Sequence, residues 1–381
     1  MTPLDGIVVA DFSRVLAGPL ATTVLADLGA TVIKVERPGV GDDTRHWGPP
    51  WTENSSSYFE CANRSKKSVE LDLGRAEDLE VARALAARAD VFVENFRDGA
   101  LQKKGLGYDE VRASNPGIVY CSITGFGSGG GAALPGYDFL VQALGGLMSI
   151  TGEAHGEPTK VGVALVDILT SKDAVIGILA ALRAREGDGL GQRVEVNLMS
   201  SLLGSLANQA SAYLATGVAP RRMGNQHPSI APYETLHCKD GALAVCCGND
   251  GQFQRLTAVI GAAQLAVDER FRTNPGRVAH RGELVRELET ALGRDTVDAW
   301  TRQLLEVGVP AGKVGDIESA IALADSLGLQ PVVPMGPGRP GQVRHPISYS
   351  RTPVTDYGVP PLLGEHNEEV REWLAEADST A

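Results

Sequence analysis

Short apolar runs alternate with amphipathic stretches through the first 200 residues, which is typical of an α/β fold. Residues 7–12 and 31–36 are predicted strands, and residues 19–28 between them carry apolar side chains at helical spacing. A strand, a helix and a second strand in this order predict a parallel βαβ unit. Further strands are expected at 68–73, 90–94, 118–123 and 192–198, and a further helix is expected at 200–214. The first part of the chain should therefore form a Rossmann-like domain around a parallel sheet.

The pattern changes near residue 217. A polar connector at 221–228 is followed by one predicted strand and by helical patterns near 250–262, 279–292 and 295–307. The Pro- and Gly-rich segment 331–344 then leads the chain elsewhere. We expect a large domain at 1–217, a smaller α+β domain at 218–330, and a return of 331–381 to the large domain.

A short apolar run in the stretch that begins at Lys160 ends abruptly on a single carboxylate, Asp167. A helical pattern begins at residue 168 and continues to about 185, so Asp167 is expected at or beside the helix N-cap. There it would face free backbone N–H groups and the positive end of the helix dipole, which favour the ionised form. Capping is the common role of such an Asp, and covalent nucleophilic catalysis is the alternative. The segment alone does not decide between them.

Composition and charge exclude several classes of protein. A hydrophobic content of 43% and a charged content of 22% are typical of a soluble globular protein, and the net charge of −12 argues against nucleic-acid binding. Five cysteines without CxxC or metal-ligand spacing indicate reduced thiols in the cytoplasm. No apolar run reaches the length of a membrane helix. We expect no bound metal and no membrane or nucleic-acid partner.

Polar residues follow several of the predicted strands, where ligands bind in open α/β sheets. Arg37 is either a surface charge or a phosphate contact, and Asn95 with Phe96 serves either a nucleotide base or turn packing. The basic stretch 63–68 is more typical of a solvated loop than of a site. The first turn, residues 13–19, lacks the Gly-x-Gly-x-x-Gly motif, which disfavours a nicotinamide-dependent dehydrogenase.

Taken together, motifs along nearly the whole chain resemble the family III CoA transferases, the CaiB/BaiF family. The segments that carry the resemblance are Leu4–Ile7, Ala17–Pro19, Leu28–Glu36, Gly41–Arg45, Asn63–Lys66, Val93–Phe96, Gly99–Leu101, Gly191–Gln192, Gly224–Pro228 and Pro361–His366. Each piece is weak alone, and their shared order makes the match specific.

The resemblance implies transfer of CoA from an acyl-CoA to a free carboxylic acid, with no tightly bound cofactor. The family's nucleophile is an Asp after an apolar strand, and Asp167 occupies that position. Its carboxylate would form a mixed anhydride and then an aspartyl-CoA thioester. By position, the family's CoA site falls on Leu16, Ala17, Arg37, Leu71, Asn95, Phe96, Lys103 and Tyr137. The family also forms an interlocked homodimer, with the site between the large domain of one subunit and the small domain of the other.

Two departures and two alternatives qualify this expectation. Leu16 replaces the Gln of formyl-CoA transferase, and the glycine loop at 223–228 is shortened, so formyl-CoA and oxalate are not expected as substrates. Acyl-CoA racemases of the family use a His in a Gly-His-Asp motif that reads Gly136-Tyr137-Asp138 here. Because Tyr is a poor base near neutrality, we favour transfer over racemisation. A catalytically silent CoA-binding protein of this fold is the other alternative.

Overall fold

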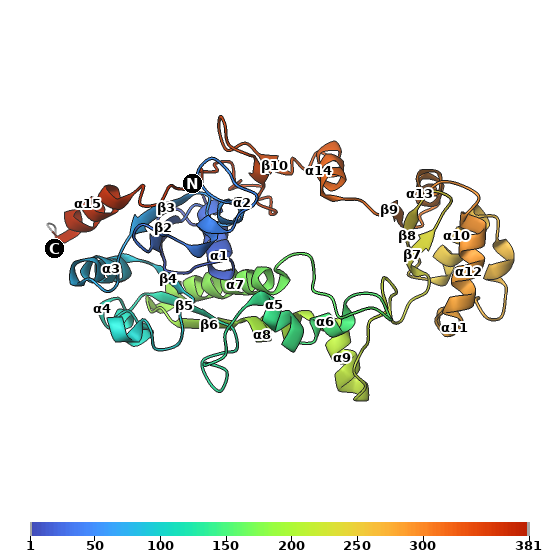
Figure 1. Cartoon of the computed structure of the whole chain (residues 1–381), viewed down its shortest axis with the longest axis horizontal. Helices are drawn as coiled ribbons and strands as arrows, with labels where there is room; N and C mark the ends of the chain where they lie inside the picture. Colours follow the sequence, from blue (N-terminus) through green and yellow to red (C-terminus); the bar gives the residue numbers. More distant parts are fainter. Residues whose placement is uncertain (1, 379–381) are drawn as a thin grey trace. The chain divides into compact units, whose positions relative to one another are not determined.

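The computed structural model describes residues 2–378, which group into two compact units (Figure 1). Unit 1 comprises residues 2–147, 160–217 and 330–378, and unit 2 comprises 148–159 and 218–329. The division expected from sequence placed 148–159 in the large domain, whereas the structure groups this segment with unit 2. No helix within residues 2–378 is both long enough and apolar enough to cross a membrane.

Unit 1 is built on a six-stranded parallel sheet in the order β3-β2-β1-β4-β5-β6. The strands are β1 (Val8–Asp11), β2 (Thr31–Glu36), β3 (Lys66–Glu70), β4 (Val91–Glu94), β5 (Val119–Thr124) and β6 (Arg193–Asn197). This is the doubly wound order, in which the carboxyl ends of the strands form the ligand-binding edge. The predicted α/β class is confirmed.

Two apolar cores cover the two faces of the sheet, because alternate residues of each strand point to opposite sides. On one face Val9 and Val32 pack with α1 (Ala17–Asp27) and α7 (Leu165–Asp188). On the other face Ala10 and Ile33 pack with α3 (Ala76–Arg88) and α15 (Asn367–Asp378). The remaining helices of this unit are α2 (Ser57–Glu60), α4 (Tyr108–Ser114), α5 (Asp138–Leu144), α8 (Leu198–Ser205) and α9 (Ala207–Thr216).

Two helices differ from their predicted forms. Helix α7 begins at Leu165, and residues 160–164 before it are loop, so the expected apolar strand ahead of Asp167 is wrong. The single helix predicted over 200–214 is divided into α8 and α9, because Ala207 adopts a left-handed φ of 42°. Such a φ interrupts a right-handed helix.

Unit 2 has its own core, formed by an antiparallel sheet and the helices packed against it. Its strands are β7 (Tyr233–His237), β8 (Ala242–Cys246) and β9 (Ala311–Lys313), in that order. Its helices are α10 (Asp250–Val259), α11 (Asn274–Ala279), α12 (Arg281–Leu292), α13 (Val297–Glu306) and α14 (Ile317–Ser326), together with the four-residue α6 (Leu147–Ile150) at its first boundary. The helices predicted near 250–262, 279–292 and 295–307 are thus found within a few residues.

Two buried arginines attach the C-terminal segment to unit 1. Arg64 pairs with Asp27 at 2.6 Å and donates to the Val343 carbonyl at 2.6 Å, beside the short ribbon of β10 (Val332–Val333) and β11 (Gln342–Val343). Arg45 pairs with Glu36 at 2.7 Å and donates to the Pro361 carbonyl at 3.2 Å. The solvated loop expected at 63–68 is therefore wrong, since Arg64 and Lys66 are buried.

Candidate active site

Asp167 lies in the first turn of α7, as its third residue, and it does not cap the helix. The N-cap position belongs to Ala164. The free N–H groups of the first turn instead donate to a carboxylate from another helix: Asp138 Oδ1 accepts from Val166 N at 2.7 Å and from Asp167 N at 3.3 Å. The capping role predicted for Asp167 is thus performed by Asp138, the first residue of α5.

A second residue of α5 extends this support. Gln142 Nε2 donates to Asp138 Oδ2 at 2.7 Å, and Gln142 Oε1 accepts from Val161 N at 2.9 Å. Both ends of the segment 161–167 are therefore bound to α5. These bonds hold the loop that leads into α7, and they are supplied by α5 and not by the Asp167 carboxylate.

The electrostatic surroundings of Asp167 oppose its ionisation. Burial raises its pKa to about 7, and the negative charge of Asp138 adds to the rise. The expectation that the helix end would favour the ionised form is therefore wrong, because Asp138 takes up the N–H groups that would have stabilised the Asp167 charge. Within the described residues the Asp167 carboxylate accepts no hydrogen bond. A carboxylate that is poorly solvated and unbonded is a strong nucleophile once ionised.

The phenol of Tyr58 lies within electrostatic range of this carboxylate pair. Burial, with the charges of Asp167, Cys61 and Asp138, raises the pKa of Tyr58 to about 12, so its phenol stays neutral. The ring of Trp47 contacts Tyr58 edge to face, with centroids 5.4 Å apart, and Trp47 is 43% exposed. No local sequence pattern singles out Tyr58, because its place near Asp167 depends on the fold.

A cavity of about 440 Å³ opens at the carboxyl ends of β1 to β4. Its walls include Phe12, Leu71 and Phe96, which follow β1, β3 and β4, and the cationic side chains of Arg14, Arg37 and Lys104. Asp72 and the ion-paired residues Lys34, Glu36 and Asp42 also line it. This volume lies in the range of small-molecule sites, and apolar walls with a few cations suit an anionic ligand that carries a base or other flat group.

The predicted CoA residues fall into two groups. Arg37, Leu71 and Phe96 line the cavity. Lys103 is exposed outside the lining, and its neighbour Lys104 supplies the cation there. The sequence placed a positive charge at this turn, and the role of Lys103 itself stays a prediction.

The other predicted CoA residues do not line this cavity. Leu16 and Ala17 are buried at the start of α1. The Asn95 amide is bonded to the backbone of Arg14 through both its oxygen and its nitrogen, at 2.9 and 2.8 Å. Tyr137 is 64% exposed at the N-cap of α5.

Arg14 is a cavity residue that the sequence did not single out. Its guanidinium lies 5.6 Å above the Phe96 ring and pairs with Asp43 at 3.1 Å, and Asp43 also pairs with Arg37 at 2.7 Å. One carboxylate thus holds two guanidinium groups beside the cavity. A cation in the loop after a strand, at the ligand-binding edge, was the available signal. No cluster of three His, Cys, Asp or Glu side chains among residues 2–378 is arranged to hold a metal ion.

Comparisons with known proteins agree with this architecture. Residues 4–367 match the model of CoA-transferase family III. The succinate–glutarate CoA-transferase of Agrobacterium fabrum is 43% identical over 394 residues, covering 100% of this chain and 97% of that protein. The acetyl-CoA:oxalate CoA-transferase of Acetobacter aceti is 39% identical, covering 90% of this chain and 89% of its own. A CaiB/BaiF family protein from Brucella suis has a TM-score of 0.88 at 44% identity, covering 98% of this chain and 99% of its own.

Proposed function

The chain belongs to CoA-transferase family III, and from that premise we propose that Asp167 is the nucleophile with which it transfers CoA from an acyl-CoA to a free carboxylic acid. The observation that supports Asp167 as the nucleophile is the raised pKa of its carboxylate, about 7. Asp138 caps the helix in place of Asp167, so the Asp167 carboxylate is not used for capping. An Asp that only stabilised its own helix would accept the N–H groups of the first turn itself, and its pKa would be lowered.

The proposed reaction has four acyl-transfer steps. The Asp167 carboxylate attacks the thioester carbonyl and the C–S bond breaks. This step forms a mixed anhydride on Asp167 and releases CoA as a thiolate. The thiolate attacks the aspartyl carbonyl, the anhydride C–O bond breaks, and the first acid leaves as its carboxylate. The incoming carboxylate then attacks the aspartyl-CoA thioester, its C–S bond breaks, and CoA leaves again as a thiolate while a second anhydride forms. The thiolate attacks the acyl carbonyl of the incoming acid, the anhydride C–O bond breaks, and the Asp167 carboxylate is released with the new acyl-CoA. No net proton is consumed, so both acids remain ionised.

We place the nucleotide end of CoA in the cavity at the ends of β1 to β4. The cavity offers Phe96 as a flat contact and Arg37 and Lys104 as cations for phosphate groups. Coenzyme A and its thioesters are then substrates, and this proposal includes no tightly bound cofactor. The walls formed by Leu71 and Phe12 would exclude water from the base.

For the exchanged acids we propose four- and five-carbon dicarboxylates, the class named for the 43%-identical Agrobacterium enzyme. Oxalate was not expected from the sequence, and the 39%-identical Acetobacter enzyme is named for that acid. The assay should therefore include oxalate as a competitor of succinate and glutarate. Free thiols at all five cysteines are consistent with a cytoplasmic reaction.

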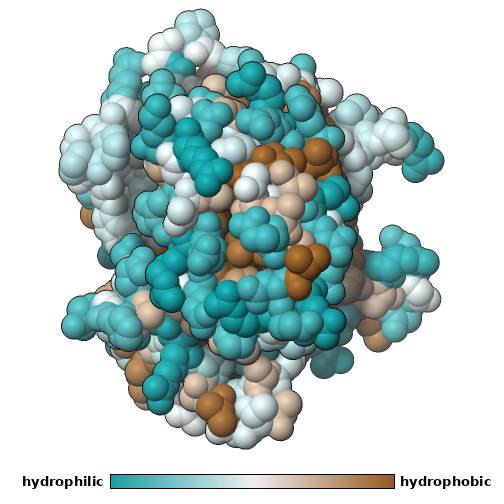
Figure 2. Space-filling model, turned by 90° about the vertical axis from the view of Figure 1, so that its right-hand side faces the viewer, coloured by the Kyte–Doolittle hydropathy of each residue, from teal (hydrophilic) through white to brown (hydrophobic). Residues whose placement is uncertain are grey.

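We also propose that the chain works as a homodimer. All residues of α9 and of α14 are at least partly exposed, and each helix presents large apolar side chains, including Leu214 and Ile317 at 81% exposure. Figure 2 shows apolar residues gathered in groups among hydrophilic ones on one face of the molecule. Apolar helices of this kind are typical of surfaces that a partner covers. Light scattering during size-exclusion chromatography should give twice the chain mass, and a monomer at micromolar concentration would contradict the proposal.

The decisive experiment combines isotope exchange with chemical trapping. Labelled succinate or glutarate is incubated with an acyl-CoA, and the aspartyl-CoA thioester is reduced with borohydride and located by mass spectrometry. Asp167→Asn should abolish exchange while CoA binding by calorimetry persists. Asp173→Asn, the same substitution at an exposed position of α7, is the matched control. Exchange by Asp167→Asn, or a trapped peptide without Asp167, would refute the nucleophile.

Racemisation is tested in the same material. A family racemase would exchange the α-proton of an acyl-CoA with D₂O and would move no CoA between acids. The position of its base is held here by Tyr137, which is mostly exposed. We expect acid-to-acid transfer without α-deuterium uptake.

A further inference from the structure

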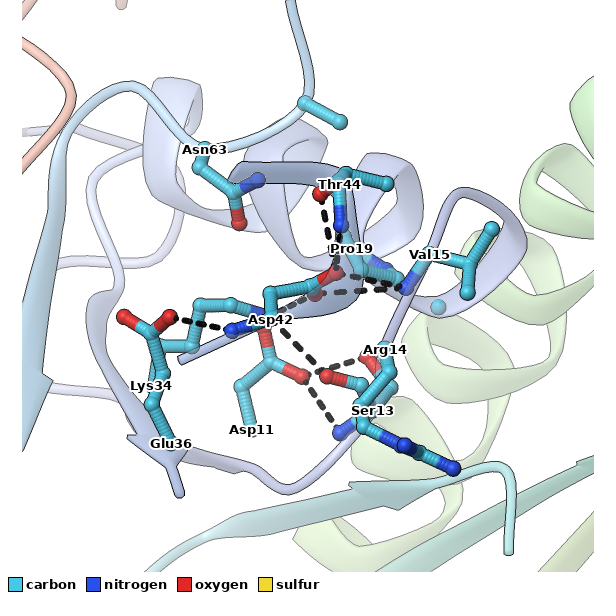
Figure 3. A network of polar contacts seen from close by, with 12 residues as sticks. Asp11, Ser13, Arg14, Val15, Pro19, Lys34, Glu36, Asp42, Thr44 and Asn63 are labelled. Carbon is cyan, nitrogen blue, oxygen red and sulfur yellow. Dashed lines mark hydrogen bonds and ion pairs between the residues drawn. The ribbon is translucent and has the colours of Figure 1, made fainter. Parts of the chain in front are cut away.

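The loop between β1 and α1 has its backbone bound by side chains instead of being open to a ligand (Figure 3). Three consecutive N–H groups donate to side-chain oxygens: Ser13 to Asp11 Oδ1 at 3.0 Å, Arg14 to Asn95 Oδ1 at 2.9 Å, and Val15 to both Asp42 oxygens at 3.3 and 3.2 Å. In dinucleotide-binding folds the corresponding N–H groups bind phosphate. Because they are occupied here, an anion at this edge must be bound by cationic side chains.

A buried ion network lies beneath this loop. The side chains of Asp11, Lys34, Asp42 and Lys66 are fully buried, in the pairs Lys34–Asp42 at 2.9 Å and Lys66–Asp11 at 3.1 Å. Lys34 also donates to the Ser13 carbonyl at 3.0 Å. Each charge depends on its partner, since a buried charge left alone is strongly unfavourable. The network therefore fixes the positions of Asp11 and Asp42 and, through them, the loop.

Val15 shows that the loop is forced into its conformation. Its φ is 71°, in the left-handed region that β-branched residues rarely occupy. Such a residue persists only where its surroundings hold it in place. The two Asp42 oxygens bind the Val15 N–H directly, so Asp42 is the group that holds this conformation.

The residue presented by the held loop is Arg14. Its side chain lines the cavity, and its Nε is buried without a hydrogen-bond partner in the described part of the chain. A buried guanidinium donor without a partner beside a cavity is suited to bind an anionic ligand. Asp43 engages only Nη1.

We infer that Arg14 is an anion-binding residue for the phosphate-bearing end of CoA, and that Asp42 is the positioning residue that holds its loop. This inference rests on the proposed function, which places CoA in the same cavity. It adds Arg14, a CoA-binding residue that the family resemblance did not assign. It also adds Asp42, a buried carboxylate that affects CoA binding through the backbone at Val15.

The first test measures CoA binding by calorimetry, with 3′-dephospho-CoA as a second probe. Arg14→Gln should weaken CoA at least tenfold, and Arg14→Lys, which keeps the charge and loses the planar fork, should weaken it less. Equal weakening of both probes would assign Arg14 to the diphosphate, and selective weakening of CoA to the 3′-phosphate. Unchanged affinity in Arg14→Gln, with weakened affinity in Arg37→Gln, would overturn this inference alone. Unchanged affinity in both would overturn the proposed CoA site itself.

The second test separates positioning from general stability. Asp42→Asn should raise the KM for acyl-CoA about tenfold with kcat within about twofold, because it weakens the bonds that hold the binding loop and leaves Asp167 unchanged. The loss of the charged partner of Lys34 should also lower the melting temperature. Adding Val15→Gly should restore most of the KM, since glycine reaches the left-handed conformation without strain. A merely structural role for Asp42 would lower the melting temperature with no change in KM and no rescue.

Matched variants keep this test decisive. Asp27→Asn alters another buried, paired carboxylate in the same unit, remote in sequence from the loop, and should lower stability without raising KM. If Asp42→Asn does not fold, Asn95→Ser removes the bonds to the Arg14 backbone while leaving the ion network intact. It should raise the KM in the same way. A KM equal to that of Asp27→Asn in either loop variant would refute the positioning role.

Discussion

The partly buried carboxylate of Asp167 should destabilise the fold that carries it. A carboxyl group that ionises at pH 3.8 when unfolded and near pH 7 when folded binds its proton more tightly in the native state. Its unfavourable contribution is absent below pH 4, grows as the pH rises, and is complete above pH 7. Asp167→Asn removes this ionisation, so the variant should gain stability over the wild type at alkaline pH and little at acid pH.

The size of the gain follows from the shift. A rise of roughly three pKa units corresponds to about 4 kcal/mol at 1.36 kcal/mol per unit, which is an upper bound. Because the Asp167 side chain is only partly buried, solvent screening reduces the expected gain to about 2 kcal/mol. Asn at this position keeps the shape of the side chain, and it also removes the repulsion between Asp167 and Asp138.

Urea unfolding at equal protein concentration provides the measurement, at pH 5 and pH 8 for the wild type, Asp167→Asn and Asp173→Asn. The difference between Asp167→Asn and wild type should widen from pH 5 to pH 8, and the exposed control should show no such change. A constant difference across this range would refute the raised pKa. The expected variant is inactive and more stable, which is the pattern of a residue retained for chemistry.

Three further predictions test other parts of the structure. Asp138→Asn removes the charge that raises the Asp167 pKa and keeps an oxygen for the helix N–H groups. The acid limb of the kcat/KM profile should therefore move to lower pH than in the wild type, and an unmoved limb would exclude coupling of the two carboxylates. Arg45→Met leaves Glu36 buried without its ion-pair partner and should cost about 3–5 kcal/mol by urea unfolding, where a loss below 1 kcal/mol would contradict the buried pair. Ala207→Gly relieves the left-handed φ of 42° between α8 and α9 and should raise stability by up to about 1 kcal/mol, whereas destabilisation would contradict that conformation.

The sheet could be predicted because each strand shows its own apolar pattern. All six predicted strands of unit 1 are found within a few residues. The inner strands are apolar over most of their length, whereas the outer strands β3 and β6 lie in stretches where apolar and polar residues alternate. The edge of the sheet could be predicted for the same reason, because residues that follow parallel strands must meet there. Arg37 and Phe96, chosen on that argument, do line one cavity.

The surroundings of Asp167 could not be predicted, because its partner lies far away in the chain. Asp138, which caps α7, is 28 residues before Val166, and its carboxylate reverses the expected effect of the helix end. The burial of Lys66 was missed for the same reason, since Asp11 is 55 residues away. Local sequence reports periodicity and turn chemistry, whereas the charge state of a group depends on neighbours that only the fold supplies.

The two buried arginines that attach the C-terminal segment also determine when each unit can be completed during synthesis. Arg45 and Arg64 cannot form their hydrogen bonds to the carbonyl groups of Pro361 and Val343 until these residues leave the ribosome, about 300 residues later. The long continuous segment of unit 2, residues 218–329, emerges in between and has its own apolar core. Unit 2 is thus expected to fold before unit 1 is finished. Until residues 367–378 have been synthesised, the outer strand β3 remains without α15, so this edge is protected only late in synthesis.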